Sequence, residues 1–320
     1  MKKFVWLGLL AIVVILAGPI LIARFSKSPP RKFTGVNLAD THYHDVGFTN
    51  SMAGLELAGM LFMPEGPGPF PGVVIIHGSG NSRRDSRWYL TLTQYLQQNG
   101  IAVLLPDKRG SERSAGNWRT ASFEDLASDT IAAIRFLKRQ DQYPISKIGV
   151  IGLSQGGHIA PIVARKSDDV AFVVDVVGSS LPMHELLLYE EDHNLREIGI
   201  LPGVSNLLAR ACALHLRKFG QPDFWNAVGN FDPLPYWQTL ACPTLVLYGA
   251  DDTNVPAKRS ADRLNALNKA NIKVTIFEGS GHALASPEGK GDSIFREDAL
   301  RQIATFVHLA SGERPTPDAE

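Results

Sequence analysis

A serine surrounded by glycines is the residue of this sequence best suited to chemistry. Ser154 stands in the run Gly152-Leu-Ser-Gln-Gly-Gly157, directly after an apolar segment and before a stretch with helical character. A strand, a sharp turn and a helix in this order lift a serine hydroxyl above the end of the strand. The turn needs small neighbours because its backbone is strained and closely packed. The pattern predicts that Ser154 is a nucleophile, with an ordinary helix N-cap as the alternative.

A serine hydroxyl attacks an acyl carbon only when a base accepts its proton, so a histidine and a carboxylate should accompany Ser154. Among nine histidines, His282 alone combines glycine neighbours with a loop after the last expected strand, and it is the expected base. The carboxylate that orients this base is expected in the loop after the preceding strand, where Asp251 and Asp252 are adjacent. Together these residues indicate hydrolysis of an ester or a similar acyl bond.

The elements that would position these residues are strands alternating with helices. Apolar runs of strand length suit a sheet that is buried on both faces. Alternation with helices implies a mostly parallel sheet with helices on both sides, so the fold class is α/β. The expected strands are 42–49 and 55–63, as an antiparallel pair, then 73–76, 101–105, 147–153, 171–177, 243–248 and 273–277, and the expected helices are 86–99, 122–139, 156–166, 257–269 and 293–310.

Residues 182–239 interrupt this alternation, because they separate two expected strands by far more residues than a single helix requires. Helical stretches are expected at 183–198 and 204–219. An insertion at this point would lie over the carboxyl edge of the sheet, where open α/β sheets bind ligands. We therefore expect a helical cap that binds a hydrophobic part of the substrate through its aromatic side chains, which are Phe224, Trp225, Phe231, Tyr236 and Trp237.

Further segments resemble, in the same order, motifs of the α/β-hydrolase superfamily. The run His77-Gly-Ser-Gly80 resembles the HGxG oxyanion loop, and Asp107 to Ser114 resembles the DxRGxGxS turn, with Glu112 in place of its second glycine. Gly249 to Pro256 resembles the acid loop GxxDxxVP. The resemblance covers about residues 45–310 and is greatest to the bacterial serine esterase and acyl-peptidase-like (dienelactone-hydrolase-like) branch. It implies an α/β-hydrolase fold.

The resemblance also implies roles for individual residues. Asp252 rather than Asp251 is the expected acid, because Asp252 occupies the aspartate of DxxVP. The backbone N–H groups of Ser79 and Gln155 are the expected oxyanion hole, by their positions in the motifs. No metal or organic cofactor is implied. Structural roles are expected for several other polar residues near the motifs, namely His77, Arg83, Arg84, Asp107, Arg109 and His158.

Composition limits the possible partners. Lys plus Arg and Asp plus Glu are equal at 32 each, so no basic field exists to bind nucleic acid. The two cysteines, Cys212 and Cys242, are too few for a disulfide framework and allow at most one optional disulfide. We therefore expect a globular protein whose partner is a small-molecule ester or acyl substrate.

The first 24 residues are expected to be a transmembrane anchor or a signal segment. An uncharged run from Phe4 to Ala23 follows Lys2 and Lys3 and ends before Arg24. As a helix this run would reach about 30 Å, the thickness of a bilayer core, whereas the apolar region of a cleaved signal is usually about 7 to 15 residues. Length favours an uncleaved anchor, and we expect the rest of the chain to face the periplasm or the cell exterior.

The expected organisation is an anchor or signal at 1–24, a linker at 25–40, a catalytic domain at 41–312 and a disordered tail at 313–320. The expected function is cleavage of carboxylic esters through an acyl-enzyme. A serine peptidase of the acyl-peptidase type is the first alternative, because of the resemblance to acyl-peptidases. A thioesterase is the second, because the same residues would cleave a thioester. A non-catalytic envelope binding protein is a further one, because fold does not fix function. The sequence makes no prediction of oligomeric state.

Overall fold

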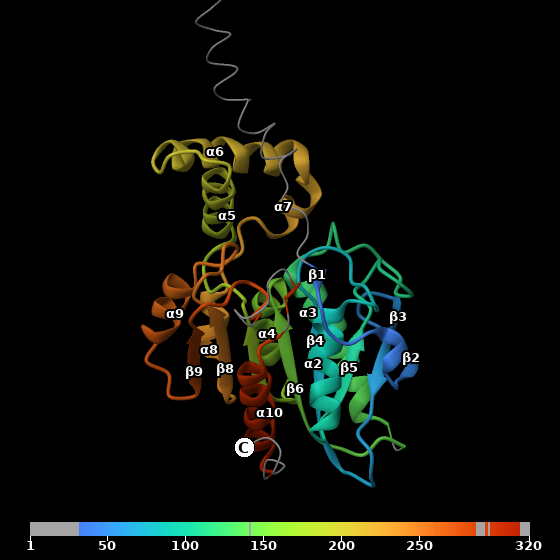
Figure 1. Cartoon of the computed structure of the whole chain (residues 1–320). Helices are drawn as coiled ribbons and strands as arrows, with labels where there is room; N and C mark the ends of the chain where they lie inside the picture. The colour runs from blue at the N-terminus through green and yellow to red at the C-terminus, as the bar shows by residue number, and fades with distance from the viewer. Residues whose placement is uncertain (1–31, 141, 286–291, 294, 314–320) are drawn as a thin grey trace, which may run out of the picture.

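A twisted, mostly parallel sheet forms the centre of the computed structural model, which describes residues 32–140, 142–285, 292–293 and 295–313 (Figure 1). The strands of this sheet are β2 (His44–Asn50), β3 (Leu55–Phe62), β4 (Phe70–Ile76), β5 (Ala102–Pro106), β6 (Ile145–Leu153), β7 (Val170–Val176), β8 (Thr244–Gly249) and β9 (Ile272–Phe277). Their order is β2-β3-β5-β4-β6-β7-β8-β9. β3 is antiparallel to both β2 and β5, and the other neighbours are parallel. The expected α/β architecture is confirmed.

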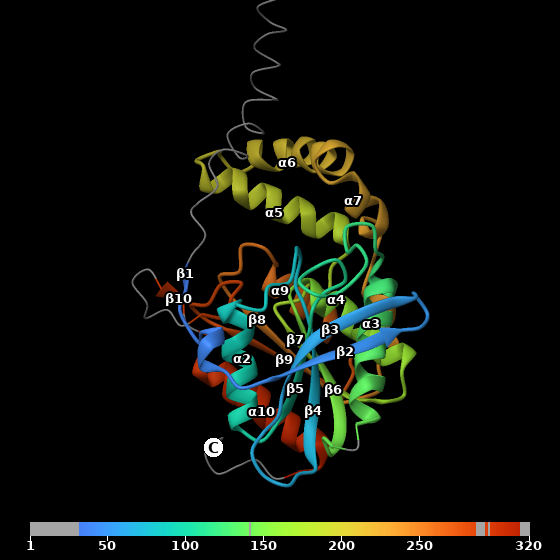
Figure 2. The same cartoon turned by 90° about the vertical axis from the view of Figure 1, so that its right-hand side faces the viewer.

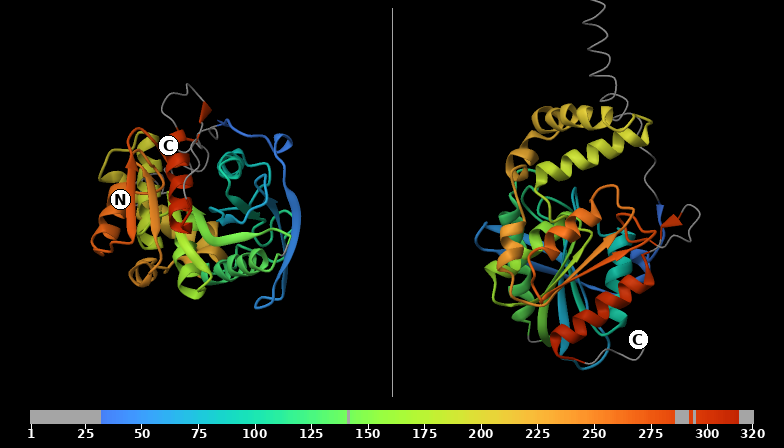
Figure 3. Two further views of the ribbon diagram at one scale, coloured as in Figure 1. Left: turned by 90° about the horizontal axis from the view of Figure 1, so that it is seen from below. Right: turned by 90° about the vertical axis from the view of Figure 1, so that its left-hand side faces the viewer.

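Helices cover both faces of the sheet because successive strand residues point to opposite sides. In β4, Val74 and Ile76 pack into the core on one face, and Val73 and Ile75 pack into the core on the other. Seen from below, α2 and α10 lie together on one side of the sheet (Figure 3). The helices of this layer are α2 (Arg87–Gln98) and α10 (Glu297–Ser311), and those of the other layer are α3 (Phe123–Lys138), α4 (Gln155–Lys166), α8 (Leu234–Thr239) and α9 (Ala257–Asn265).

Several element boundaries differ from the expected ones. The helix expected at 257–269 ends at Asn265, and Asn268 has a φ of 49° in the left-handed region, which does not continue a helix. The helix expected at 293–310 begins at Glu297. Residues Asp292–Ser293 form a short strand, β10, paired with β1 (Lys32–Phe33). Residues 32–40, expected as part of a linker, contain β1 and the turn of 3-10 helix η1 (Leu38–Asp40).

The inserted segment forms a helical layer beyond the carboxyl ends of the strands (Figure 2). The elements of this layer are α5 (Met183–Glu197), α6 (Val204–His215), the π-helical turn η2 (Leu216–Gly220) and α7 (Pro222–Val228), whereas α8, at the end of the expected insertion, packs against α4. We call these four elements the cap. A small core of its own, which includes Leu195, Leu208 and Cys212, joins α5 to α6. Cys212 and Cys242 are both unpaired, so the optional disulfide is not formed.

The predicted anchor or signal at residues 1–24 lies outside the described residues, and so does the predicted tail at 313–320 except for Glu313, whose N–H donates a hydrogen bond to the backbone oxygen of His308. Within the described ranges, no helix has both the length and the apolar character needed to cross a bilayer. The anchor therefore stays a prediction from the sequence.

Asp175 is a fully buried carboxyl group at the centre of the sheet, on β7. Its Oδ1 accepts a hydrogen bond from the N–H of Gly178 at 2.8 Å. Gly157 packs so closely against it that an added Cβ would lie 2.1 Å from Oδ1. Burial raises the pKa of Asp175 to about 8. The folded protein therefore keeps this group protonated at neutral pH.

This burial predicts a pH-dependent stability that the variant Asp175→Asn should remove. An unfolded aspartate releases its proton near pH 4, whereas the folded one holds it to about pH 8, so wild-type stability should fall across that window. Relative to the wild type, Asp175→Asn should gain up to roughly 4 kcal/mol of unfolding free energy between about pH 5 and pH 8. Urea unfolding at both pH values measures the difference, and a difference that does not change with pH would contradict the assignment.

Candidate active site

The turn that holds Ser154 requires its glycines. Ser154 has a φ of 53°, a strained conformation for a residue with a side chain. A Cβ on Gly152 would lie 2.3 Å from the carbonyl oxygen of Gly156. A Cβ on Gly156 would lie 2.1 Å from the carbonyl oxygen of Ile76, at the end of β4. The glycines therefore let β6, α4 and β4 meet at the point where the serine hydroxyl leaves the backbone.

Ser154, His282 and Asp252 form one hydrogen-bonded chain. The Oγ of Ser154 lies 2.8 Å from Nε2 of His282, and Nδ1 of His282 lies 2.8 Å from Oδ2 of Asp252. The second carboxylate oxygen of Asp252 accepts hydrogen bonds from the N–H groups of Asn254 and Val255, at 2.8 and 2.9 Å. Asp252 is buried, whereas Asp251 is exposed. The structure thus brings the three expected residues together and places Asp252, rather than Asp251, against the histidine.

The protonation of His282 is set by opposing influences. Burial lowers its pKa, but the carboxylates of Asp252 and Glu190 together outweigh burial, so the pKa is raised above its usual value. Burial raises the pKa of Glu190 to about 7. Glu190 stands on α5 of the cap, and the sequence analysis did not identify it. Its only sequence signal, a place at the start of the acidic run Glu190-Glu-Asp192, does not indicate which of these side chains points toward the serine.

The cap also contacts the loop that carries the acid. The hydroxyl of Tyr189 donates a hydrogen bond to the backbone oxygen of Asp252 at 2.9 Å. Asn254 donates one to Oε1 of Glu190 at 3.2 Å. Helix α5 is therefore bonded directly to the segment that holds the carboxylate.

The expected oxyanion donors lie beside the serine. Ser79 and Gln155 both line the pocket that contains Ser154. Neither of their backbone N–H groups donates a hydrogen bond to another described residue. Two free amides next to a serine hydroxyl are the donors that a developing oxyanion requires.

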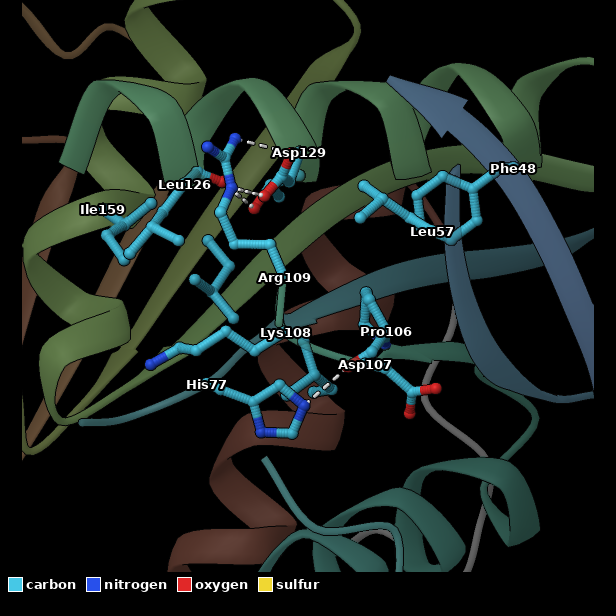
Figure 4. Close-up of a pocket in the computed structure, with 13 residues that line it drawn as sticks. Phe48, Leu57, His77, Pro106, Asp107, Lys108, Arg109, Leu126, Asp129 and Ile159 are labelled. Atoms are coloured by element: carbon cyan, nitrogen blue, oxygen red, sulfur yellow. Dashed lines mark hydrogen bonds and ion pairs between the residues drawn. The ribbon is translucent and has the colours of Figure 1, made fainter. Parts of the chain in front are cut away.

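Lys108, a residue that the sequence analysis did not single out, joins the loop that contains Ser79 to the side chain of Gln155. Its buried ammonium group donates to the backbone oxygens of Gly78 and Gly80, and to Oε1 of Gln155 at 2.9 Å. Burial lowers the pKa of Lys108 to about 7. Figure 4 shows its side chain between His77 and Arg109, along a small cavity of about 40 Å³ behind the oxyanion loop. The only sequence signal was its place between Asp107 and Arg109, in the turn that follows a buried strand.

Most of the polar residues interpreted as structural have their bonding partners away from the serine. The guanidinium group of Arg84 forms a bidentate pair with Asp107, and that of Arg109 pairs with Asp129 on α3. Glu112, at the position of the motif's second glycine, adopts a φ of 50°, which explains why glycine suits that position. Arg83 pairs with exposed Asp85, and His77 forms a hydrogen bond with the backbone oxygen of Pro106. His158 packs against Phe123 but also lines the pocket that contains Ser154.

A pocket of about 350 Å³ lies between the serine and the cap. Its only charged lining residues in the described part of the chain, apart from histidines, are Glu190 and Glu191. Trp225 is in its wall as expected, but Trp237 is fully buried and does not line it, because α8 packs against α4. Phe231 and Tyr236 stack on each other beside α3 instead. The cap contributes six apolar residues to its wall, namely Met183, Leu186, Leu187, Leu216, Phe224 and Trp225.

Two family models match this chain. Residues 131–288 match the model of the BAAT / acyl-CoA thioester hydrolase C terminal, and residues 69–188 match that of serine aminopeptidase, S33. The esterase Pf2001 of Pyrococcus furiosus has a similar structure, with a TM-score of 0.61 at 20% identity, over 88% of this chain and 96% of that one. This chain has the α/β-hydrolase fold. The resemblance seen in its sequence motifs is confirmed.

Curated relatives of this chain include proteins named as esterases and proteins named as thioesterases. The esterase EstD of Thermotoga maritima is 25% identical over 74% of this chain and 60% of its own length. Acyl-coenzyme A thioesterase 1 of Mus musculus is 24% identical over 79% of this chain and 62% of its own length. The chain thus spans about three fifths of the length of these relatives. The comparisons indicate a hydrolase enzyme, as the sequence predicted.

The bonds of Lys108 predict that it positions the loop of Ser79, one of the two expected oxyanion donors. In Lys108→Met the loop that includes Ser79 loses its link to Gln155, so kcat should fall roughly ten- to a hundredfold with little change in KM. Steady-state kinetics on a soluble ester measure both constants. Lys258→Met, at an exposed lysine, is the control. An unchanged kcat in a folded Lys108→Met protein would show that the loop holds its shape without this residue.

Glu190 predicts a pH effect on the base. Its negative charge raises the pKa of His282, so Glu190→Gln should lower that pKa and move the acid limb of the kcat/KM profile to lower pH. The shift should be partial, because Glu190 itself has a pKa of about 7 and is only partly charged in that range. Glu191→Gln, which changes a neighbouring carboxylate in the same pocket, is the matched control. Equal profiles for both variants would exclude this role of Glu190.

Proposed function

We propose that this chain is a serine hydrolase that cleaves carboxylic esters through an acyl-enzyme intermediate. The observation that supports it best is the hydrogen-bonded chain from Ser154 through His282 to Asp252, with both links at 2.8 Å. Such a chain gives a hydroxyl group a base within reach and gives that base a fixed tautomer.

In the proposed reaction the Oγ of Ser154 attacks the ester carbonyl carbon while Nε2 of His282 accepts its proton. The carbonyl oxygen becomes an oxyanion that accepts hydrogen bonds from the N–H groups of Ser79 and Gln155. When the carbon–oxygen bond of the ester breaks, His282 returns the proton to the leaving alcohol. Water then attacks the acyl-serine by the same route, releasing the acid and restoring Ser154. The carboxylate of Asp252 stabilises the imidazolium formed in each step.

The pocket supports an uncharged, partly apolar substrate. Its wall combines aliphatic and aromatic side chains with Glu190 and Glu191, and the described lining contains no lysine or arginine. An anionic acyl or alcohol group would meet two carboxylates there. Of these two, Glu190 has a pKa of about 7 and can therefore be protonated and neutral near pH 7. An acyl chain without charge is therefore the group that we assign to this pocket.

A thioesterase is the second candidate, supported by the match of residues 131–288 to the acyl-CoA thioester hydrolase model. The same nucleophile and base serve a thioester. The phosphates of a coenzyme A leaving group would have to remain outside the pocket, away from its two glutamates. For this reason we rank the ester first, and the peptidase suggested by the serine aminopeptidase model third.

The proposal is tested with a fluorophosphonate probe and a short-chain p-nitrophenyl ester, applied to the full chain and to Ser154→Ala. Labelling and turnover should both vanish in the variant. Asp252→Asn should lower kcat by about 10⁴, because the histidine loses the carboxylate that holds its tautomer. The adjacent Asp251→Asn should stay near the wild-type rate, which makes it the matched control.

Two outcomes would overturn the proposal. A folded wild type that neither labels nor turns over would favour a binding protein on this fold. Labelling that persists in Ser154→Ala would mean that another residue is the nucleophile. Competition between the p-nitrophenyl ester and an acyl-CoA thioester then separates the first candidate from the second, because each predicts the larger kcat/KM for its own substrate.

A further inference from the structure

The outer surface of the cap is unusually apolar. The described part of the chain exposes eight large hydrophobic side chains, and five of them lie in one segment of nineteen residues. Isolated apolar residues are normal on a protein surface, but a contiguous group marks an interaction site. The five are Leu201, Val204, Leu207, Leu214 and Phe219, with exposed fractions of 73%, 51%, 67%, 56% and 75%.

On α6 these residues form a stripe. Val204, Leu207 and Leu214 are spaced by three and seven positions, which places them on one side of a helix. The opposite side, with Leu208 and Cys212, is buried against α5. The helix is therefore apolar on two sides, although packing within the chain explains only one of them.

The charges on the same segment are all of one sign. Between Val204 and Gly220 the sequence contains Arg210, Arg217 and Lys218 but no aspartate or glutamate. Arg210, Lys218 and the adjacent Phe219 are exposed. Leucine and phenylalanine beside arginine and lysine is the composition of helices that lie in the interface of a bilayer and attract anionic lipids.

The position of α6 in the molecule allows such contact. α6 forms the outermost layer of the cap, on the side away from the sheet (Figures 1 and 2). β1, where the described chain begins, lies toward the same end of the α/β domain (Figure 2). Only residues 24–31 separate β1 from the apolar run that ends at Ala23, and eight extended residues span at most about 28 Å. An anchor formed by that run would hold this end of the protein near the membrane.

We propose that the outer face of α6 and η2 binds the surface of an anionic lipid bilayer, with Leu207, Leu214 and Phe219 inserted among the lipids. A second copy of the chain is the competing occupant of this face. The basic residues favour the lipid, because two such faces would bring like charges together, whereas anionic head groups would neutralise them. This inference does not depend on the proposed esterase activity.

The test uses the full chain with vesicles of phosphatidylcholine and phosphatidylglycerol that contain a lipid with a photoreactive acyl chain. After illumination, mass spectrometry of peptides locates the labelled residues. We expect labelling within 204–219, and weaker labelling when phosphatidylglycerol is replaced by phosphatidylcholine. The double variant Leu207→Glu, Leu214→Glu should reduce labelling of this segment by at least about tenfold, because two leucines no longer insert.

The matched control is the double variant Met52→Glu, Leu309→Glu, which changes two equally exposed apolar residues outside the cap. It should label as the wild type does. Thermal unfolding should show the same Tm for both double variants, since all four side chains are exposed, and this readout is independent of any catalytic activity. Three results would overturn the proposal: no label within 204–219, a label unaffected by Leu207→Glu and Leu214→Glu, or cross-links between copies through α6 in place of lipid labelling.

Discussion

The close approach of α4 to the end of β4 is the constraint on which the rest of the site depends. Gly156 lies against the carbonyl oxygen of Ile76 with no space for a side chain. Because the oxyanion loop starts at the next residue, His77, this contact fixes the distance between that loop and Ser154. Lys108 then joins the loop to Gln155 from the end of β5. Three neighbouring strands thus end at one place, and the chemistry is assembled from their ends.

Charge is distributed unevenly around these strand ends. Behind the oxyanion loop, cations are neutralised in buried pairs, such as Arg84 with Asp107 and Arg109 with Asp129. Such pairs fix the loops that they join, since breaking one leaves a buried charge without a partner. The substrate side contains carboxylates instead, and Glu190 is one of them. In the reaction that we propose, the imidazolium of His282 would therefore face negative charge from both the acid loop and the cap.

The sequence predicted the sheet and the three residues of the hydrogen-bonded chain because both leave local signals. Strands buried on both faces are continuously apolar, and the turn around Ser154 admits few residues other than glycine. The role of Lys108 left no such signal, because its three acceptors come together only when two loops close on it. Trp237 was misplaced for a related reason. Composition identifies an aromatic segment, but the packing of α8 against α4 decides which rings reach the pocket.

The hydrogen bonds from α5 to the acid loop have a consequence for protein engineering. Tyr189 holds the backbone of Asp252, and Glu190 accepts from Asn254. A chimaera that received the cap of another protein with this fold would keep Ser154 and the N–H groups of Ser79 and Gln155, which follow strand ends. It would lose the partner of the acid loop. Cap and acid loop therefore form one exchangeable module, and substrate range in this scaffold is best altered by transplanting the two together.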